Sequence, residues 1–426
     1  MGILRSLQIG ISGMTASGNA LGVAGDNIAN AGTNGFKASR AEFQDVLSTT
    51  LRGIDGGDQF GAGTRLAHIR PMFTQGNVSR TDNITDLALN GNGFFIIDAP
   101  FGRGFTRDGA FGFDKEGHMI NADGYRVLGF ASDENGRIVN QLAPIKLGNT
   151  TIAAKATDTV RVMMNLDCRE EIKQFKVENA ENTSSFSSGI TVYDNIGTAR
   201  LVTIYYNKIA DNQWEYHAVI DGKDATNGKE KTLVEMANGK LIFNDKGVLQ
   251  EEIPGQNAFN FNKGAAQGQK INFDFGKSIK EGGDGLTGST QYGSSSNVAR
   301  HTQDGYSAAT LTSMSFNDDG VLTAVYNNGI SRNIAQIAVA RFENNEALMK
   351  VGKNLYKESR ASGEAAIGKP GESGRGEVFS KSLELSNVDL AEEFVTLMNM
   401  QRNFQANVKT LTTADQMLQE IINLRR

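Results

Sequence analysis

A seven-residue apolar repeat in the last forty residues constrains this chain more than any other feature. A heptad repeat with two inward files keeps one face of a helix turned toward a partner helix. No Pro or Gly interrupts the run from 388 to 426, and Asn387 or Asp389 is suited to cap its start. Glu392 and Glu393 near that start, with Arg425 and Arg426 at the end, match the helix dipole. We predict a C-terminal helix within residues 380–426. The first of its two inward files is Leu390, Leu397, Phe404, Leu411 and Leu418. The second is Phe394, Gln401, Val408, Asp415 and Ile422.

The first thirty residues carry a matching repeat, which predicts a helix over residues 1–32. Gly18 and Gly25 in its second file would let a partner backbone approach closely, although each costs about 1 kcal/mol against Ala in a helix interior. We expect this helix to pair with 380–426 as a coiled coil, so that everything between them is one long insertion. The two N-terminal files are Leu7, Met14, Leu21 and Ile28, and Leu4, Ile11, Gly18 and Gly25.

Two paired helices are marginal on their own, because the stability of a helix comes mainly from tertiary packing. Many copies packed side by side would supply that packing, and a head-to-tail interface that does not close generates a helical polymer. We therefore expect disordered termini before assembly. The residues predicted to pack the core of the polymer are Leu7, Met14, Leu21, Ile28, Leu390, Phe394, Leu397, Phe404, Val408, Leu411, Leu418 and Ile422.

The rest of the chain predicts a mainly β protein. Its 49 Gly and 5 Pro, with frequent Asn and Asp, are typical of many turns between strands. A Phe-led strand followed by an acidic Gly turn recurs at 113–117, 243–249 and 316–322; we interpret these as hairpin turns and not calcium loops, because the remaining EF-hand ligands are missing. The predicted parts are an extended connector at 33–72, a β domain at 73–158 and 301–360, an inserted outer β domain at 159–300, and a Gly-rich connector at 361–379.

The residue patterns of an enzyme are missing from the sequence. The four histidines are isolated, with no metal-ligand spacing, and no phosphate-binding loop or nucleophile elbow occurs. A net charge of −5 gives no sign of a nucleic-acid-binding surface. No apolar run approaches the roughly 20 residues of a membrane span, and no Sec signal peptide opens the chain. We expect no enzymatic activity, cofactor, metal, nucleic-acid partner or membrane insertion.

The single cysteine, Cys168, has two interpretations. It follows the strand-like alternation of Val160, Val162, Met164 and Leu166. One interpretation is a small buried hydrophobe at a strand end. The other is a reactive thiol, if a cation such as Arg169 lowers its pKa.

Several short motifs at both ends resemble the bacterial flagellar axial family of rod and hook proteins. They cover about the first 130 and the last 50 residues, and the inserted β domain matches less clearly. The motifs are Ser12-Gly13-Met14, Asp26-Asn27-Ile28-Ala29-Asn30, Gly35-Phe36-Lys37, Asn90-Gly91-Asn92-Gly93-Phe94-Phe95, Thr106-Arg107-Asp108-Gly109, Leu385-Ser386-Asn387-Val388-Asp389-Leu390, Gln401-Arg402 and Phe404-Gln405-Ala406-Asn407.

Within this family, length and nesting are similar to those of the hook, the curved universal joint that transmits torque from rod to filament. The resemblance implies type III export, no cofactor, and a tubular homopolymer with the terminal helices lining its inner tube. The implied partners are the distal rod protein, the hook cap protein, the hook–filament junction protein and the export apparatus. The implied location is outside the cytoplasm, either extracellular or in a periplasmic flagellum of the spirochaete kind.

The resemblance gives Cys168 a specific expectation. In spirochaete hook proteins a cysteine just before the inserted domain loses its sulfur to form dehydroalanine, and a lysine amine of a neighbouring subunit adds to give lysinoalanine. Cys168 and Lys155 are similar to that pair, although Arg169 stands where an amide residue is expected. We also expect the Gly-rich connectors, at Gly56, Gly57 and Gly371, to act as hinges when outer domains slide.

Two alternatives remain open at this point. One is a distal rod subunit of the same family, which is straight and rigid. The other is a secreted carbohydrate-binding β protein, suggested by Trp214 and Tyr216 and by Asn-rich loops.

Overall fold

A computed structural model describes residues 2–47, 61–133, 136–148, 150–226, 228–283 and 287–424. The chain divides into two compact units. The terminal unit comprises residues 1–148, 313–325 and 331–426, and the inserted unit comprises 149–312 and 326–330. Residues 159–300, predicted as the inserted domain, lie within the inserted unit, which begins earlier and ends later in the sequence.

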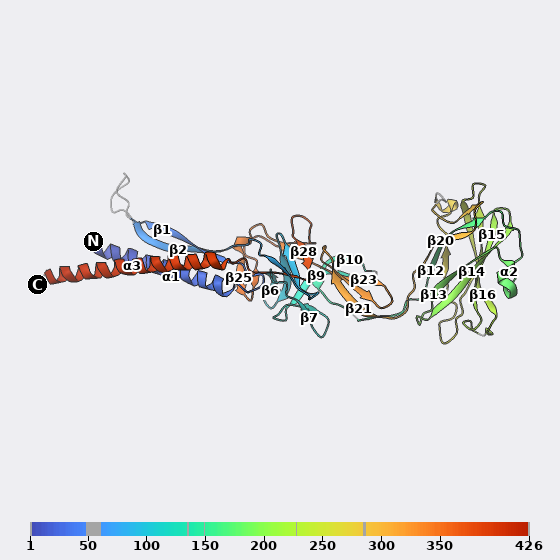
Figure 1. Cartoon of the computed structure of the whole chain (residues 1–426), viewed down its shortest axis with the longest axis horizontal. Helices are drawn as coiled ribbons and strands as arrows, with labels where there is room; N and C mark the ends of the chain where they lie inside the picture. The colour runs from blue at the N-terminus through green and yellow to red at the C-terminus, as the bar shows by residue number, and fades with distance from the viewer. Residues whose placement is uncertain are drawn as a thin grey trace. The chain divides into compact units, whose positions relative to one another are not determined.

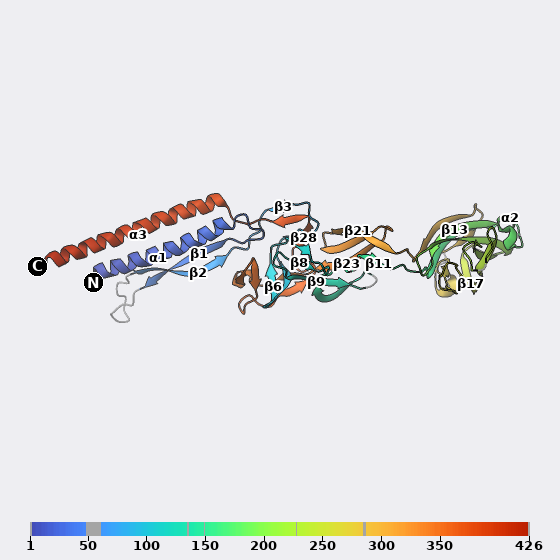
Figure 2. The same cartoon turned by 90° about the horizontal axis from the view of Figure 1, so that it is seen from below.

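Two long helices occupy the ends of the chain. Helix α1 (Gly2–Ala29) and helix α3 (Leu390–Leu424) lie side by side in Figures 1 and 2. They run antiparallel, because Asn27 near the end of α1 bonds Glu393 near the start of α3, whereas Gly10 lies beside Asn407 and Leu411. The predicted class, mainly β with paired terminal helices, is confirmed.

Among the described glycines of α1, Gly10 and Gly13 lie against α3. A Cβ on Gly13 would lie 2.6 Å from the Asn407 Nδ2 atom, and one on Gly10 would lie 3.6 Å from the Asn407 carbonyl oxygen. Gly18 and Gly25, which the sequence suggested for this role, have nothing within 4 Å of such a Cβ. The glycines that face α3 are therefore Gly10 and Gly13, and not the predicted Gly18 and Gly25.

The start of α3 is capped by Asp389, whose Oδ1 accepts hydrogen bonds from the main-chain N–H groups of Ala391 and Glu392. Asn387, the other predicted cap, bonds a different part of the chain. An Asp at this position satisfies helix donors that have no partner within the helix, and its charge suits the helix dipole.

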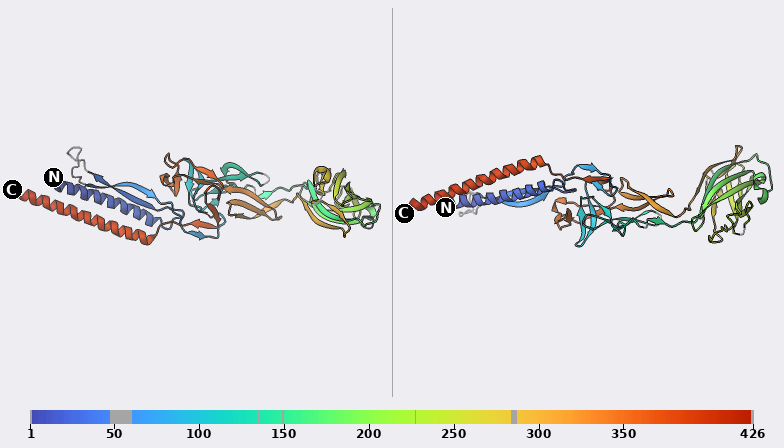
Figure 3. Two further views of the ribbon diagram at one scale, coloured as in Figure 1. Left: turned by 90° about the horizontal axis from the view of Figure 1, so that it is seen from above. Right: turned by 60° about the horizontal axis from the view of Figure 1, so that its bottom comes forward.

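A β-hairpin lies along α1. Strands β1 (Ser39–Leu47) and β2 (Gly61–Pro71) pair antiparallel, from Ser39 opposite Pro71 to Leu47 opposite Gly61. Figure 3 shows the hairpin beside α1, and the Thr64 N–H donates to the Ser12 hydroxyl oxygen at 3.2 Å. The stretch 33–72, predicted as an extended connector, thus contains paired strands. A two-stranded ribbon is marginal alone, so this hairpin depends on its contact with α1, which its own sequence pattern does not reveal.

The β body of the terminal unit is built on β5, which is buried on both faces. Phe95 and Ile97 enter one apolar cluster with Leu322 and Ile337, whereas Phe94 and Ile96 enter another with Phe342. Neighbouring strands in the main sheet follow the order β23-β9-β5-β6-β26-β25. The elements are β3 (Val78–Arg80), β4 (Leu87–Asn90), β5 (Phe94–Ala99), β6 (Gly102–Thr106), β7 (Gly112–Phe113), β8 (Met119–Ile120), β9 (Arg126–Ser132), β10 (Ile138–Pro144), β22 (Val321–Tyr326), β23 (Ser331–Ile337), β24 (Val339–Arg341), η3 (Asn345–Ala347), β25 (Met349–Gly352), β26 (Leu355–Lys357), β27 (Ala366–Gly368), β28 (Glu377–Ser380) and β29 (Ser382–Glu384).

The stretch 361–379, predicted as a Gly-rich connector, is part of this β body. Strand β27 pairs with β24, and β28 pairs with β4. Between them, Gly371 has a φ of +73° and donates its N–H to the Gly376 carbonyl oxygen at 3.1 Å. Gly371 therefore forms a tight turn between strands, where glycine is favoured because only Gly adopts positive φ without steric cost.

The inserted unit is a two-layer β structure. One sheet has the order β13-β14-β15-β16-β17, and in the other β12 pairs with β18, β19 and β20. The core between them is lined by alternate residues of β12 and β15, including Val162, Leu166, Trp214 and Tyr216. The elements are β11 (Thr151–Ile152), β12 (Thr159–Asp167), η1 (Val177–Asn179), α2 (Ala180–Thr183), β13 (Phe186–Tyr193), β14 (Ala199–Ala210), β15 (Gln213–Asp221), β16 (Leu233–Phe243), β17 (Leu249–Asn257), β18 (Asn272–Asp274), η2 (Ile279–Glu281), β19 (Thr290–Tyr292) and β20 (Asn297–Gln303). Strand β21 (Ala309–Phe316) begins in the inserted unit and ends in the terminal unit.

The repeated acidic Gly motifs form tight turns of one design. The Asp114 side chain accepts hydrogen bonds from the N–H groups of Glu116 and His118, and the Asn244 side chain accepts them from Lys246 and Val248. The glycines of the three turns, Gly117, Gly247 and Gly320, have φ between +69° and +81°. The Asp114 and Asn244 side-chain oxygens therefore bond main-chain N–H groups within the turn, as in an Asx-turn.

Candidate assembly site: the terminal helices and the ion-pair cluster that joins them to the β body

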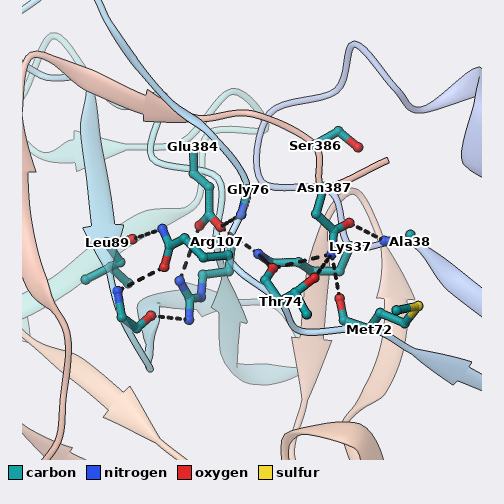
Figure 4. A network of polar contacts seen from close by, with 12 residues as sticks. Lys37, Ala38, Met72, Thr74, Gly76, Leu89, Arg107, Glu384, Ser386 and Asn387 are labelled. Carbon is teal, nitrogen blue, oxygen red and sulfur yellow. Dashed lines mark hydrogen bonds and ion pairs between the residues drawn. The ribbon is translucent and has the colours of Figure 1, made fainter. Parts of the chain in front are cut away.

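A fully buried ion-pair cluster lies where the segments leading to the helices meet the β body. The Glu384 carboxylate lies with Oε1 2.6 Å from Lys37 Nζ and Oε2 3.2 Å from Arg107 Nη1. None of the three side chains is more than 2% exposed. Figure 4 shows the three side chains converging from the N-terminal segment, the β body and the C-terminal segment. We name Lys37, Arg107 and Glu384 the ion-pair cluster.

Main-chain groups complete the cluster. Lys37 Nζ donates to the Thr74 carbonyl oxygen at 2.7 Å, Arg107 Nη2 donates to the Gly91 carbonyl oxygen at 2.7 Å, and the Gly76 N–H donates to Glu384 Oε1 at 2.9 Å. Burial lowers the pKa of Lys37 and of Arg107, and the carboxylate of Glu384 opposes that lowering. One carboxylate thus balances two buried cations, and removing a partner from such a group costs about 3–5 kcal/mol.

Gly35 lets the N-terminal segment pass close to the cluster. It has a φ of +65°, and its N–H donates to the Glu384 carbonyl oxygen at 2.7 Å. A Cβ at this position would lie 2.5 Å from the Arg107 carbonyl carbon. Both the positive φ and the close approach require glycine.

Two asparagines extend the joint to the helices themselves. The Asn387 side chain accepts from the Ala38 N–H and donates to the Met72 carbonyl oxygen, both at 2.8 Å. The buried Asn27 side chain accepts from the Ser39 N–H and donates to Glu393 Oε1, again at 2.8 Å. These bonds tie the end of α1, the base of the hairpin and the start of α3 together.

Most members of this joint belong to the motifs that carried the sequence resemblance, namely Asn27, Gly35, Lys37, Gly91, Arg107 and Asn387. The sequence gave no sign that they meet, because Lys37 and Glu384 are separated by 347 residues. Glu384 precedes its motif by one position and was missed. The available signal was a charged residue within each motif, which does not identify its partner.

The helix residues predicted to pack a polymer core fall into two groups. Leu390, Phe394, Phe404 and Ile422 are exposed at 46%, 51%, 38% and 65%. The half-buried members are Leu7, Met14, Leu21, Ile28, Leu397, Val408, Leu411 and Leu418.

Of the two predicted files on α3, only one lies against α1. The file that accompanies Leu397 and Leu411 on that side contains Glu393, Asn407 and Ala414. In the predicted second file Phe394 and Ile422 are exposed, whereas Val408 is half-buried. The predicted helix pairing is correct, but its second file was assigned to the wrong side of the seam.

The structure places Cys168 and Lys155 at opposite ends of β12. Nine residues of extended strand lie between the two ends, a separation of roughly 30 Å at about 3.3 Å per residue. Lys155 Nζ lies 2.8 Å from Asp304 Oδ2, and this hydrogen bond raises the pKa of Lys155. The two residues therefore do not meet within one chain.

Arg169 does not act as a free cation beside Cys168. Its guanidinium group donates to both carboxylate oxygens of Asp167, at 2.9 and 2.7 Å, and these bonds lower the pKa of Asp167 to about 2. Cys168 is half-buried, and its carbonyl oxygen accepts from Lys208 Nζ at 2.7 Å. The predicted activation of the thiol by Arg169 is thus opposed by an existing ion pair.

Of the remaining predicted residues, those that the structure describes do not gather into an active or binding site. Gly56 and Gly57 lie outside the described residues. Trp214 and Tyr216 are buried in the core, where Trp214 Nε1 donates to Gln291 Oε1, so they present no carbohydrate-binding face. In the described ranges, no three His, Cys, Asp or Glu side chains are placed to hold a metal ion. Among the helices described, none combines the length and apolar character that a membrane span requires.

Four family models match successive parts of the chain. They are the flagella basal body rod protein family over residues 7–37, the flagellar hook protein FlgE/F/G D1 domain over 88–165, the flagellar basal body protein FlaE D2 domain over 165–306, and the flagellar basal body rod FlgEFG protein C-terminal family over 380–424. The FlaE D2 match falls on the inserted unit. The two terminal matches fall on α1 and α3.

Whole proteins match over their full length. The chain is 32% identical to the flagellar hook protein FlgE of Escherichia coli (strain K12), over 97% of this chain and 98% of that protein. It is 33% identical to FlgE of Borreliella burgdorferi and 32% identical to FlgE of Treponema pallidum, in each case over at least 99% of both chains. A crystal structure of the Helicobacter pylori flagellar hook protein FlgE2 shares the fold, with a TM-score of 0.54 at 14% identity over 72% of this chain and 100% of that one.

The chain has a helix at each end, two β units between them in the sequence, and a buried ion-pair cluster that joins the helix segments to the β body. With the matches to the rod families, these features define a structural protein of the bacterial flagellar axis. The likeness to hook proteins includes the inserted unit as well as both ends. The chain belongs to the flagellar hook protein family. It is a structural subunit of the hook and not an enzyme, and it forms part of the flagellum outside the cytoplasm.

Proposed function

We propose that copies of this chain assemble through α1 and α3 into the curved tubular hook, the joint that transmits torque from rod to filament. The observation that carries the proposal is the exposed apolar surface of α3. Large side chains on it lie open in the single chain: Leu390, Phe394, Val395, Met398, Phe404, Met417, Ile421 and Ile422. Fully burying a side chain of this kind is worth about 1.5–3 kcal/mol, so side-by-side packing of many copies gains what one chain leaves exposed.

The ion-pair cluster gives such a polymer a mechanical path. Force on the helices passes to the β body through Glu384, which bonds both Lys37 and Arg107. A buried group with several bonds resists local opening more than an exposed loop does. The joint therefore keeps the helices and β body of the terminal unit moving together during rotation.

The polymer has ends and a route of delivery, which define the other partners. The distal rod protein lies at one end, and the hook cap protein followed by the hook–filament junction protein lies at the other. The type III export apparatus delivers the subunit through the growing tube. The hook then lies outside the cell, or in the periplasm where the flagellum is periplasmic.

Electron microscopy of the purified chain after salting out tests the assembly. Curved tubes are expected. Straight tubes would instead support a rod subunit, and an absence of tubes would contradict self-assembly. The double variant Ile421→Ser with Ile422→Ser should raise the protein concentration needed for assembly, whereas the matched double variant Glu420→Ser with Asn423→Ser, at exposed polar positions, should not.

We propose that Cys168 of one subunit and Lys155 of a neighbour form a lysinoalanine crosslink. Their separation along β12 supports a bond between subunits and not within one. Loss of the Cα proton and of the hydrosulfide anion from Cys168, together one hydrogen sulfide, leaves dehydroalanine. The neutral Lys155 amine then adds to its Cβ, forming the C–N bond, while one amine proton is transferred to Cα. The net change is the loss of one hydrogen sulfide per crosslink. Intact-polymer mass spectrometry tests it: recovery of the Cys168 peptide wholly as free thiol would remove the idea.

We propose that Gly371, together with Gly56 and Gly57, lets the outer parts of the subunit adjust as the hook bends. Gly371 supports this role because its φ of +73°, in a turn between strands, lies in a region that glycine adopts more freely than any other residue. Stiffening these glycines should straighten the polymer, and unchanged curvature in electron micrographs would count against the role.

A further inference from the structure

Lys208 places its ammonium group on the main-chain carbonyl group of Cys168. Lys208 Nζ donates a hydrogen bond to the Cys168 carbonyl oxygen at 2.7 Å. Lys208 lies near the end of β14, and Cys168 is the first residue after β12. The Lys208 side chain is only 10% exposed, whereas a lysine is rarely so buried unless its charge has a partner. The inserted unit thus holds a cation against the Cys168 peptide group, in a place that little solvent reaches.

Other contacts fix the position of Cys168 within the inserted unit. The Cys168 N–H donates to the Tyr292 carbonyl oxygen at 3.2 Å. The next residue, Gly293, lies beside the sulfur, because a Cβ on Gly293 would be 3.8 Å from Cys168 Sγ. Cys168 itself is half-buried. The folded chain therefore fixes the orientation of the Cys168 carbonyl group while part of the residue stays open to solvent.

The carbonyl group of a cysteine takes part when that cysteine loses its sulfur. Removal of the Cα proton leaves an electron pair that spreads onto the carbonyl oxygen of the same residue, forming an enolate. A hydrogen-bond donor already aimed at this oxygen stabilises the charge as it develops, and such donors are often the largest single contribution to catalysis. A donor that carries a positive charge forms the stronger bond.

The charge of Lys208 is available to this oxygen. Asp211 Oδ1 lies 3.6 Å from Lys208 Nζ, but the Asp211 side chain is 94% exposed, so water screens this pair. The Asp167 carboxylate is bound through both oxygens by Arg169, which is the main cause of its lowered pKa, and the charge of Lys208 adds to that effect. Arg169 is therefore engaged by a carboxylate, whereas Lys208 contacts the neutral oxygen that becomes negative in the elimination.

We propose that Lys208 is the catalytic residue of the elimination that converts Cys168 to dehydroalanine. Its ammonium group stabilises the enolate oxygen of Cys168. This inference rests on the proposed lysinoalanine crosslink and deepens it by assigning the group that promotes its first step. It also explains why a lysine is buried at the end of β14, where its hydrogen bond reaches the residue that reacts.

The step balances without an oxidant or a reductant. A hydroxide ion from the solvent takes the Cα proton and becomes water, and the electron pair moves onto the carbonyl oxygen that Lys208 bonds. The pair then returns to form the Cα–Cβ double bond. The Cβ–S bond of the neutral thiol breaks with both electrons on sulfur, which leaves as the hydrosulfide anion. Lys208 keeps its proton throughout.

The second step of the crosslink uses the same group. Addition of the Lys155 amine to Cβ pushes an electron pair onto the carbonyl oxygen of residue 168, so the same enolate forms again. Transfer of one amine proton to Cα then gives the product. Lys208 of the subunit that carries Cys168 thus assists both steps, whichever neighbouring subunit supplies Lys155.

An experiment on the unassembled full chain isolates the elimination. Cys168 is the single cysteine, so a bis-alkylating dibromide converts its thiol into a cyclic sulfonium group, and loss of this group leaves dehydroalanine. Mass spectrometry follows the rate of that loss. Lys208→Met removes the charge and should slow it about tenfold or more. Lys208→Arg keeps a cation and should stay within about threefold of the unmodified chain.

Two controls separate this role from a structural one. The rate at which iodoacetamide alkylates the Cys168 thiol should change by less than about twofold in Lys208→Met, because this rate reports thiol exposure and ionisation and not enolate formation. Lys240→Met breaks an exposed pair with Glu215 in the same sheet and should leave the elimination rate unchanged.

A comparison without substitution covers the case in which Lys208→Met does not fold. The sulfonium form of the unmodified chain should eliminate at least about threefold faster when folded than in concentrated urea at the same pH, because Lys208 bonds the carbonyl oxygen only in the folded chain. Elimination that is equally fast or faster in urea would overturn the role of Lys208. Equal rates in the unmodified chain and a folded Lys208→Met variant would overturn it too.

Assembled tubes separate this inference from the crosslink itself. Crosslinks that form as fast in Lys208→Met as in the unmodified chain overturn the role of Lys208 and leave the crosslink standing. Unmodified tubes that keep Cys168 wholly as free thiol overturn the crosslink. The single-chain elimination rates then still decide, by themselves, whether Lys208 stabilises the enolate.

Discussion

Glu384 Oε1 lies 2.6 Å from Lys37 Nζ, although 347 residues separate the two positions in the chain. The other carboxylate oxygen of Glu384 bonds Arg107, which belongs to the β body. One side chain therefore fixes three segments, and the two ends of the chain leave this point together as α1 and α3. The pairing of the helices starts from a joint that polar contacts define and apolar packing then extends.

Replacing Glu384 by Gln should destabilise the terminal unit strongly. The variant leaves Lys37 and Arg107 buried without a compensating charge, a change that costs about 3–5 kcal/mol. The free energy of unfolding from denaturant titration of the full chain measures the loss. The inserted unit should unfold as before, because the cluster lies wholly in the terminal unit.

An exposed ion pair in the same unit supplies the control. Lys353 Nζ lies 2.8 Å from Asp123 Oδ1, with side chains 58% and 26% exposed. Asp123→Asn should cost less than about 1 kcal/mol. Equal losses for Glu384→Gln and Asp123→Asn would show that the cluster does not hold the joint.

The glycines of α1 should respond differently to the same substitution. Gly13→Ala places a methyl group 2.6 Å from Asn407 Nδ2, so the Asn407 side chain must move, and the variant should be less stable than Gly18→Ala by about 1–2 kcal/mol. Gly18→Ala meets nothing within 4 Å and should stabilise the isolated chain by up to about 1 kcal/mol, because Ala is the better helix former. Thermal unfolding followed by helical circular dichroism measures both. Equal effects of the two substitutions would contradict the close contact between Gly13 and Asn407.

The sequence predicted the elements whose signal is local and periodic. The heptads identified α1 and α3, and the strand-like alternation from Val160 to Leu166 identified β12. It did not predict the hairpin of β1 and β2, whose stability comes from α1, or the side of α3 that faces α1. The sequence did not predict the ion-pair cluster either, because three single charges in distant segments do not show which of them pair. These features depend on contacts between distant segments, and such contacts cannot be derived from local patterns in a single sequence.

If the proposed crosslink forms, Asp304→Asn should increase its yield in assembled tubes. The addition step needs a neutral Lys155 amine, and the hydrogen bond that Lys155 Nζ donates to Asp304 Oδ2 raises the pKa of Lys155. Asp304 Oδ1 accepts hydrogen bonds from the N–H groups of Asp158 and Thr159. Asn keeps an oxygen for these two bonds but removes the negative charge. Mass spectrometry of polymer digests measures the ratio of crosslinked to free peptide.

Arg161→Gln, which breaks an exposed pair with Asp274 elsewhere on β12, is the matched control and should leave that ratio unchanged. A yield that falls in Asp304→Asn, or that rises equally in both variants, would contradict the role of the Lys155–Asp304 pair.

Glu252 on β17 should make the inserted unit less stable as the pH rises through the neutral range. Burial, aided by the carboxylates of Asp274 and Glu281, raises the pKa of Glu252 from 4.5 to about 7. Between these values the folded chain holds a proton that the unfolded chain has released, so stability falls with increasing pH and levels off above about pH 7. Glu252→Gln removes the charge and should stabilise the unit by about 1–3 kcal/mol at pH 8, with little effect at pH 4.5. Denaturant titrations at the two pH values measure the difference.

Glu251→Gln, at a neighbouring carboxylate that pairs with Lys280, is the control and should change stability by less than about 1 kcal/mol at both pH values. A gain for Glu252→Gln that is the same at both pH values would mean that packing and not the buried charge is responsible.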